Sequence, residues 1–260
     1  MSAPLPDPSS PFSAIFWNVW VESQVTNAKL QKLYGRFDEF IAKYKPDVFG
    51  LNEVLSHNGN QQPPLLKHLE EQGYRTFFAP FSPESNGHFS GSAFASRIDP
   101  LELTVHELGP DKYGARRGHP GNTIKLIRAR LLHAGVPVNI VVNYLAHLVP
   151  YNWAMHIQHH RAFRAVVRVP ELQSATIIGG DFNQFKFMHR LWGARSIYDR
   201  ATGTLLHPTW RLAGKIPIIQ ANYDNIFWTK CGKLLLRDFR VLDRAPSDHT
   251  PLLASFIVKP

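Results

Sequence analysis

Carboxylate and amide side chains follow directly after a short apolar run in the second half of the sequence. The segment GGDFN, residues 179–183, comes after the apolar run ATII, and its two glycines allow a tight backbone turn. In an extended chain Asp181 and Asn183 point the same way. A carboxylate acceptor beside an amide donor can hold a water molecule and a phosphoryl oxygen. An Asx-rich turn is the alternative, and it leaves the order Gly-Asp-x-Asn unexplained.

Histidine side chains also lie next to apolar runs, as Asp181 and Asn183 do. Asp248 and His249 precede the apolar run PLLASFIV. A neutral histidine accepts a proton, and a protonated one neutralises a phosphoryl oxygen. Asp224, in NYDNIFW, can orient such a histidine through its Nδ1 atom. His147 closes the run VNIVVNYLAHL, where a packed structural imidazole is the alternative.

Two further polar residues lie near the start of the chain. Asn18 stands inside the apolar run FWNVW, where a buried amide needs hydrogen-bond partners, and a structural turn-capping role is the alternative. Glu53 follows DVFGLN, so a strand would deliver its carboxylate to the edge of a sheet, where oxygen can hold a hard cation. A solvated loop glutamate is the alternative. Together these residues indicate one polar site with a place for a cation.

The elements that must position these residues follow from apolar periodicity. Thr26 is a plausible N-cap, Pro46 ends the helix that follows, and Ala134 with Gly135 fits a hairpin turn. Adjacent hairpins mixed with crossover helices favour two mixed sheets. The pattern predicts helices at 26–44, 65–72 and 153–169, and strands at 13–20, 47–51, 74–79, 91–97, 101–107, 122–132, 137–147, 175–178, 225–229, 233–241 and 252–258.

The remaining stretches are expected to be a tail and loops. Residues 1–11 are rich in proline and favour a flexible extended tail, which leaves 12–260 as one domain. The polar or Gly/Pro-rich stretches 80–90, 109–121 and 199–222 are expected to be loops. Loops of this length are often binding loops, and plain surface connections are the alternative.

Composition restricts the partners and the compartment. The chain has 260 residues, 44% hydrophobic and 19% charged, which is typical of a globular protein. Its net charge of +9 favours a polyanionic partner such as nucleic acid or an anionic membrane surface. Cys231 is the single cysteine, so no disulfide forms within the chain. With no recognisable signal peptide and no membrane-spanning apolar run, we expect a cytoplasmic protein, and a monomer.

Three histidines in the 153–169 helix raise the question of zinc. His156 and His160 are one helical turn apart and could share a metal, with His159 between them. No glutamate lies between them, so the HExxH pattern of metalloproteases is absent. Surface or core histidines are the favoured interpretation.

The ordered motifs resemble those of a known superfamily. They are WN at 17, NE at 52, GSAFASR at 91, HL at 147, GDFN at 180, YDNIF at 223 and SDH at 247. This series is similar to that of the endonuclease/exonuclease/phosphatase superfamily, which has the fold of DNase I, and it spans the chain from Phe12 to about Val258. GDxN with a C-terminal SDH is specific, whereas WN and NE are individually weak. The resemblance implies an α/β fold, a four-layer α/β/β/α sandwich of two packed mixed sheets flanked by helices.

The resemblance also implies a divalent-metal-dependent phosphoesterase that uses Mg²⁺, with Mn²⁺ as a substitute. Glu53 would be the principal metal ligand, Asn18 would position the metal or the phosphate, and Asp248 would contribute to the metal region. Trp20 stands where apurinic endonucleases carry an acidic residue, so we expect neither a second metal there nor specificity for abasic sites.

The implied catalytic residues match the other motifs. Asp181 would align or deprotonate the attacking water, and Asn183 would hold a phosphoryl oxygen. His249 would contact the phosphate with Asp224 orienting it, and His147 would act as an acid or phosphate clamp. The motif around His147 lacks the Thr or Ser common in related enzymes, so its setting is the least defined.

Three functions remain open. A nucleic-acid phosphodiesterase is favoured by the net charge and by basic residues that could meet phosphates if they share a face, namely Arg116, Arg117, Lys125, Arg128 and Arg130. Alternatively, Arg128 and Arg130 simply lie on the solvent-facing side of a half-buried strand. A phospholipid phosphodiesterase or inositol phosphate phosphatase is second, with YNW at 151–153 or FKFM at 185–188 as aromatic protrusions. A non-catalytic binding protein is least favoured, because every expected polar position is filled.

Overall fold

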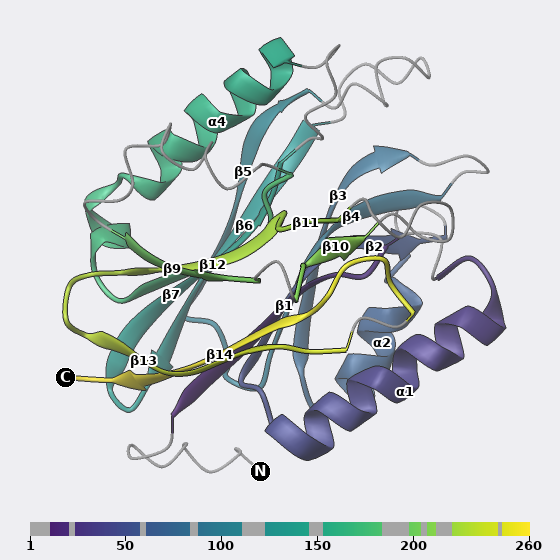
Figure 1. Cartoon of the computed structure of the whole chain (residues 1–260), viewed down its shortest axis with the longest axis horizontal. Helices are drawn as coiled ribbons and strands as arrows, with labels where there is room; N and C mark the ends of the chain where they lie inside the picture. Colours follow the sequence, from purple (N-terminus) through teal and green to yellow (C-terminus); the bar gives the residue numbers. More distant parts are fainter. Residues whose placement is uncertain are drawn as a thin grey trace.

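Two mixed β-sheets pack face to face, with helices on both outer faces (Figure 1). The computed structural model describes residues 11–20, 24–57, 61–83, 88–110, 123–145, 153–183, 198–203, 207–211, 220–243 and 246–260. Helices α1 and α2 cover the first sheet and α4 covers the second. The predicted four-layer α/β/β/α sandwich is therefore confirmed.

The first sheet joins the two ends of the chain. Its six strands have the order β13-β14-β1-β2-β4-β3, in which β1 and β2 are parallel and the other neighbours are antiparallel. The central strands are almost wholly buried, which fits their continuous apolar runs. The strands span Phe12–Asn18 (β1), Val48–Ser56 (β2), Arg75–Pro83 (β3), Phe89–Ser96 (β4), Leu234–Val241 (β13) and Leu252–Val258 (β14).

The second sheet holds the middle of the chain in the order β5-β6-β7-β8-β12-β9. Strands β7 and β8 are parallel, and the other neighbours are antiparallel. A separate ribbon pairs the two-residue strands β10 and β11. The bounds are Glu102–Pro110 (β5), Thr123–His133 (β6), Val136–Tyr144 (β7), Thr176–Asp181 (β8), Tyr198–Thr202 (β9), Trp210–Arg211 (β10), Gln220–Ala221 (β11) and Asp224–Thr229 (β12).

The helices form where sequence periodicity places them. The Thr26 side chain caps α1 (Asn27–Tyr44) by accepting a hydrogen bond from the Lys29 amide, and Lys45 ends the helix in a left-handed conformation. Helix α2 spans Pro64–Glu71, and α4 spans Trp153–Val167 with a short 3-10 turn (η4) at Pro170–Gln173. The apolar faces of α1 and α2 pack on the first sheet, and that of α4 packs on the second.

All three of the expected loops overlap strands. Residues 80–83 continue β3, and Pro80 and Pro83 are tolerated there because β3 is an edge strand. Residues 199–222 hold most of β9 and the β10–β11 ribbon, so the expectation of one long loop was wrong. Strand β5 extends to Pro110, and 111–121 lie outside the described residues. Residues 1–10 of the expected tail lie outside them as well.

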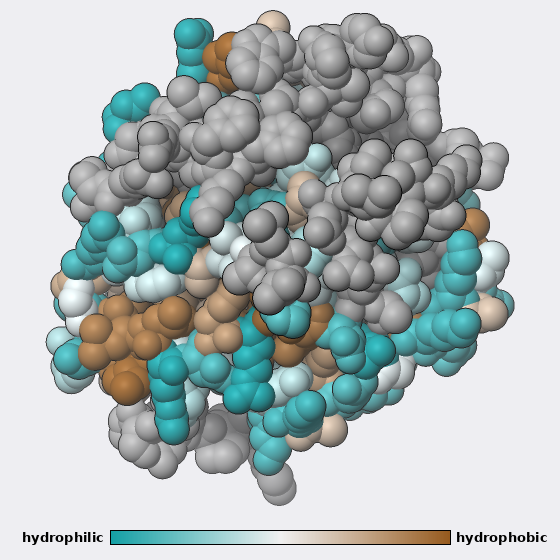
Figure 2. Space-filling model, viewed as in Figure 1, coloured by the Kyte–Doolittle hydropathy of each residue, from teal (hydrophilic) through white to brown (hydrophobic). Residues whose placement is uncertain are grey.

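The surface shown in Figure 2 is mainly hydrophilic where residues are described, with a hydrophobic area near the β13–β14 hairpin. The exposed apolar side chains of that hairpin are Leu235 and Ile257, which face each other across the two strands. Among the helices in the described ranges, none combines the length and the apolar character needed to cross a membrane.

Candidate active site

Glu53 reaches the site through a bulge in β2. The register between β2 and β4 shifts between Leu51 and Val54, and Glu53 has a left-handed backbone with φ of 57°. A bulge re-aims a side chain, and a non-glycine residue in this region stores strain on the order of 1 kcal/mol. Glu53 Oε1 accepts hydrogen bonds from Asn18 Nδ2 at 3.0 Å and from the Tyr144 hydroxyl at 3.3 Å. The bulge therefore turns Glu53 toward the end of β1.

Asp181 ends β8 and is held on every side. Asn18 Nδ2 donates to its Oδ2 at 3.0 Å, and Asn52 Oδ1 accepts from its backbone amide at 3.0 Å. Asn183 donates from its backbone to Oδ1 at 2.8 Å and from its side chain to Oδ2 at 3.1 Å. The Asn183 amide also donates to the Leu145 carbonyl at 2.7 Å. The Asn183 side chain thus links the Asp181 carboxylate to the Leu145 backbone.

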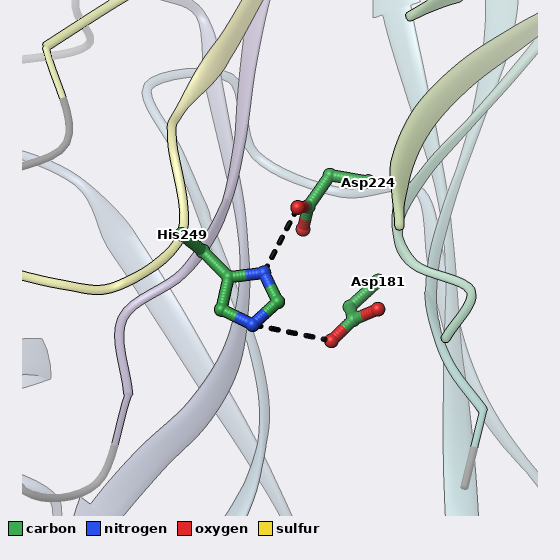
Figure 3. Close-up of side chains that lie close together, drawn as sticks. All are labelled: Asp181, Asp224 and His249. Atoms are coloured by element: carbon green, nitrogen blue, oxygen red, sulfur yellow. Dashed lines mark hydrogen bonds and ion pairs between the residues drawn. The ribbon is translucent and has the colours of Figure 1, made fainter. Parts of the chain in front are cut away.

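His249 lies between carboxylates from different strands (Figure 3). Its Nδ1 atom is 2.9 Å from Asp224 Oδ2, and its Nε2 atom is 3.8 Å from Asp181 Oδ2. Asp224 and Asp181 are cross-strand partners of β12 and β8, whereas His249 comes from the segment before β14. All three are buried. Side chains from both sheets therefore meet here.

The charges in this cluster are strongly coupled. Burial lowers the pKa of His249, but the negative charges of Asp224 and Asp181 outweigh it and raise the pKa to about 10. Burial raises the pKa of Asp181 to about 7, although the positive charge of His249 lowers it. His249 is accordingly a cation at neutral pH, and it donates its Nδ1 proton to Asp224.

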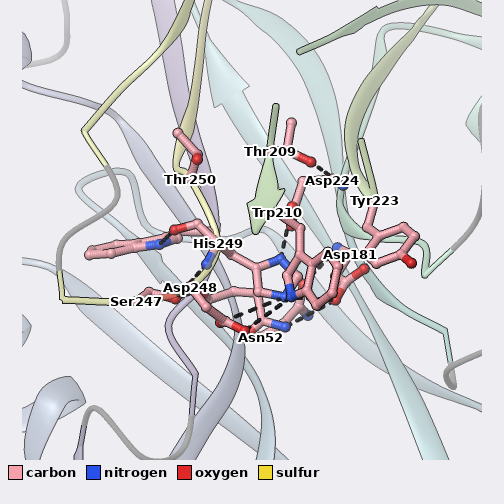
Figure 4. A network of polar contacts seen from close by, with 12 residues as sticks. Asn52, Asp181, Thr209, Trp210, Tyr223, Asp224, Ser247, Asp248, His249 and Thr250 are labelled. Atoms are coloured by element: carbon pink, nitrogen blue, oxygen red, sulfur yellow. Dashed lines mark hydrogen bonds and ion pairs between the residues drawn. The ribbon is translucent and has the colours of Figure 1, made fainter. Parts of the chain in front are cut away.

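Asp248 completes the group on the side of Glu53. Trp210 Nε1 donates to Asp248 Oδ2 at 3.0 Å, and the Trp210 ring lies against Tyr223 with centroids 5.1 Å apart (Figure 4). Asp248 Oδ1 is 3.9 Å from His249 Nε2. Burial raises the pKa of Asp248, His249 lowers it, and the negative charge of Glu53 raises it further. Glu53 and Asp248 are therefore close enough to repel each other.

The carboxylates fit a divalent cation. Within the described part of the chain, Asp224 Oδ1 and Asp248 Oδ1 are buried oxygens with no hydrogen-bond partner. Ligand atoms of Asp181, Asp224 and His249 lie within 4.8 Å of one another, a grouping able to hold a metal ion. A hard ion such as Mg²⁺ prefers oxygen ligands, and His249 Nδ1 is already bonded to Asp224. The buried negative charge around His249 favours binding of a cation.

Not all of the predicted site residues can be placed at the site. His147, Arg116, Arg117 and the FKFM segment at 185–188 lie outside the described residues, as do Tyr151, Asn152 and the side chain of Trp153. Strand β6 carries the other basic residues, but alternation along the strand places Lys125 on the opposite face from Arg128 and Arg130. Lys125 therefore does not meet the condition of sharing a face with Arg128 and Arg130.

Several residues that support the site were not predicted from the sequence. Asn52 belongs to the NE motif, and it accepts the hydrogen bond that fixes the Asp181 backbone. Gln24 holds the bulge by donating to the Glu53 carbonyl at 2.8 Å and accepting from the Leu55 amide at 2.9 Å. Trp210 and Tyr144 contact the Asp248 and Glu53 carboxylates. Only the position of Asn52 next to Glu53 gave a signal, since the other contacts depend on tertiary structure.

Solved structures share this fold. An endonuclease/exonuclease/phosphatase from Beutenbergia cavernae matches with a TM-score of 0.71 and 18% identity, over 95% of this chain and 72% of that one. The human Nocturnin catalytic domain with bound sulfate anion matches with a TM-score of 0.69 and 20% identity, over 96% and 94%. D. rerio TDP2 complexed with single strand DNA product matches with a TM-score of 0.68 and 17% identity, over 95% and 99%.

Comparison by sequence gives the family. No curated protein matches the chain. The model of the Endonuclease/Exonuclease/phosphatase family matches residues 15–249, which include every described residue of the site. Members of this superfamily are hydrolases that act on phosphate esters. The chain belongs to the endonuclease/exonuclease/phosphatase family.

Proposed function

We propose that this protein is a divalent-metal-dependent phosphoesterase that hydrolyses phosphodiester bonds, with nucleic acid as the favoured substrate. The observation that carries the proposal is the position of the buried His249 ring, with Nδ1 2.9 Å from Asp224 Oδ2 and Nε2 3.8 Å from Asp181 Oδ2. Neighbouring carboxylates raise the pKa of His249, and burial raises the pKa of Asp181. The pair therefore supplies a phosphate-binding group and a proton acceptor in one place.

In this proposal Asp181 aligns the attacking water and accepts its proton. Hydrogen bonds from Asn18 and Asn183 fix the carboxylate, so its orientation needs no adjustment during the reaction. His249 donates a hydrogen bond from Nε2 to a phosphoryl oxygen and stabilises the charge that develops there. Asp224 keeps the imidazole oriented through Nδ1. The part assigned to His147, an acid or phosphate clamp, stays a prediction.

Glu53 and Asp248, with Asn18 between Glu53 and Asp181, would hold Mg²⁺, with Mn²⁺ as a substitute. Such an ion polarises the phosphoryl group and stabilises the leaving oxygen. The fit rests on the repulsion between Glu53 and Asp248 and on Asp248 Oδ1, a buried oxygen with no hydrogen bond among the described residues. Trp210 and Tyr144 orient the two carboxylates from outside.

Hydrolysis of bis-p-nitrophenyl phosphate tests the reaction without assuming a biological substrate. We expect turnover with Mg²⁺ or Mn²⁺ that EDTA abolishes. Asp181→Asn and His249→Gln should lower kcat about 100- to 10,000-fold while the protein stays folded by circular dichroism. Asp199→Asn, which breaks only an exposed ion pair with Lys230, is the matched control and should retain full activity. Turnover in EDTA, or full activity of Asp181→Asn, would refute the proposal.

Identifying the substrate class requires a comparison of several phosphate esters. The net charge of +9 and the fold shared with a TDP2 bound to a single-stranded DNA product support nucleic acid. The alternative is a phospholipid or inositol phosphate, and a non-catalytic binding protein is less favoured. Plasmid DNA, single-stranded DNA, RNA, sphingomyelin and inositol phosphates should be compared under one set of conditions. Turnover of only the lipid or inositol substrates would overturn the nucleic-acid assignment. The cytoplasmic location and the monomeric state also stay predictions.

A further inference from the structure

Helix α4 carries a second group of potential metal ligands, apart from the acidic site. His156 and His160 are one turn apart, and their Nε2 atoms lie 3.0 Å from each other. The ring centroids are 4.6 Å apart with an interplanar angle of 65°. His156 is 1% exposed and His160 is half-buried. Both rings thus direct the same nitrogen atom to one point.

The separation matches two ligands of one ion. Two nitrogen ligands at 2.0–2.1 Å from a tetrahedral Zn²⁺ lie about 3.3 Å apart, so a small side-chain movement accommodates the ion. The other explanation is a hydrogen bond between two neutral imidazoles, in which one Nε2 donates and the other accepts. The sequence favoured purely structural histidines, whereas the convergence of the two Nε2 atoms fits a chelating pair.

Neighbouring contacts keep the pair aligned. His159 lies between them in sequence but points elsewhere, since its Nε2 atom is 3.1 Å from the Pro110 carbonyl at the end of β5. Its ring also lies against Gly109, where an added Cβ atom would come within 3.0 Å of the imidazole. His159 therefore fixes α4 against the sheet and leaves the ion to His156 and His160.

We propose that His156 and His160 bind one transition-metal ion, of the class of Zn²⁺, Ni²⁺ or Cu²⁺, through their Nε2 atoms. Imidazole nitrogens favour these ions over Mg²⁺, which distinguishes this pair from the carboxylate site. Each neutral ring binds through its Nε2 lone pair and carries its proton on Nδ1, so no net proton is lost. Water fills the other coordination positions. The ion would tie together the first turns of α4, the helix that follows the segment containing His147.

The test must separate this pair from other ligands. His57 and His88 form another close pair, with Nδ1 atoms 3.0 Å apart, so every measurement uses a His57→Gln background. Calorimetry in excess Mg²⁺ measures Zn²⁺ binding to this background protein and to the same protein carrying His156→Gln or His160→Gln as a second substitution. His106→Gln, a partly buried histidine on β5, is the matched control. We expect each variant of the pair to weaken one Zn²⁺ site by about tenfold or more, and the control to leave it unchanged.

A direct readout covers the case in which a variant folds poorly. Long-range ¹H–¹⁵N spectra of the unmutated pair should show both Nε2 resonances shifting on addition of one equivalent of Zn²⁺. The half-buried His160 is the safer of the two substitutions, and thermal unfolding checks both. Unshifted His156 and His160 resonances, or equal Zn²⁺ affinity in folded His160→Gln and its background, would overturn the proposal. Neither outcome depends on phosphoesterase activity.

Discussion

Glu53 reaches the site with a strained backbone conformation. Its φ of 57° lies in the region that glycine favours, and it stays there because Gln24 bonds both sides of the bulge. Asn183, with φ of 47°, occupies the same region, which asparagine tolerates better than most residues. Local strain therefore coincides with the residues assigned to the metal and to Asp181, as at many functional sites.

Trp210 is a positioning residue for Asp248. Trp210→Phe keeps a ring against Tyr223 but removes the Nε1 donor to Asp248 Oδ2. A hydrogen bond to a charged group contributes about 1.5 to 3 kcal/mol, so we expect the Mn²⁺ dissociation constant to rise about tenfold or more. Electron paramagnetic resonance of free Mn²⁺ measures this without relying on turnover.

The control for Trp210 is Trp228→Phe, which changes an indole that packs on Phe256 away from the site. It should leave Mn²⁺ affinity unchanged. Should Trp210→Phe bind Mn²⁺ as tightly as the unaltered protein, the indole would have no part in holding Asp248.

Gly179 in strand β8 lets the two sheets approach each other closely. A Cβ atom at Gly179 would lie 2.3 Å from the Phe16 ring, which is itself fully buried. We expect Gly179→Ala to lower the free energy of unfolding by about 3 kcal/mol through overpacking. Urea denaturation monitored by tryptophan fluorescence measures the change.

Gly35 provides the opposite control for that substitution. It lies in α1 with nothing within 4 Å of an added Cβ atom, so Gly35→Ala should stabilise the protein by about 0.5 to 1 kcal/mol. Equal effects of the two alanine substitutions would mean that the contact between Phe16 and β8 is looser than described.

Helix α4 makes stability depend on pH through His159. Burial lowers the pKa of His159 to about 4, although the hydrogen bond to the Pro110 carbonyl raises it. The unfolded chain therefore binds the proton more readily, and this part of the stability is present above pH 6.5 and is lost as pH falls toward 4. Between pH 7.5 and pH 5 the loss from this residue should be about 2 kcal/mol.

Paired urea titrations at these two pH values isolate the effect. His159→Gln keeps a donor for the carbonyl but does not titrate. Between pH 7.5 and pH 5 its free energy of unfolding should therefore fall by about 2 kcal/mol less than that of the unaltered protein. His207→Gln changes an exposed histidine and should follow the unaltered protein. An unchanged pH dependence in His159→Gln would contradict the account of how α4 docks.

Local sequence signals predicted the helices well and the site geometry only in part. The start and end of α1 follow from Thr26 and Pro46, which act within a few residues. The bulge at Glu53 depends on pairing with β4, and the bond from Trp210 to Asp248 joins residues 38 apart in the sequence. Strand β9 was missed because its segment, YDRAT, has no clear alternation. Contacts set by tertiary pairing leave little trace in a single sequence.

At the scale of the whole molecule, two electrostatic fields oppose each other. The chain carries +9 and attracts polyanions over a Debye length. The site itself concentrates carboxylates, which repel a phosphodiester, and they come from both sheets, at Glu53, Asp181, Asp224 and Asp248. His249 offsets this charge only in part. In the proposed mechanism, a divalent cation at Glu53 and Asp248 would reconcile long-range attraction with close approach of the substrate.

The position of that cation is the central claim, and a crystal soaked with Mn²⁺ and a short phosphodiester tests it most directly. The anomalous difference map should show a peak within about 2.5 Å of carboxylate oxygens of both Glu53 and Asp248, with a phosphoryl oxygen near His249 Nε2. A peak bound instead by Asp181, Asp224 and His249, or no peak at saturating Mn²⁺, would contradict the account.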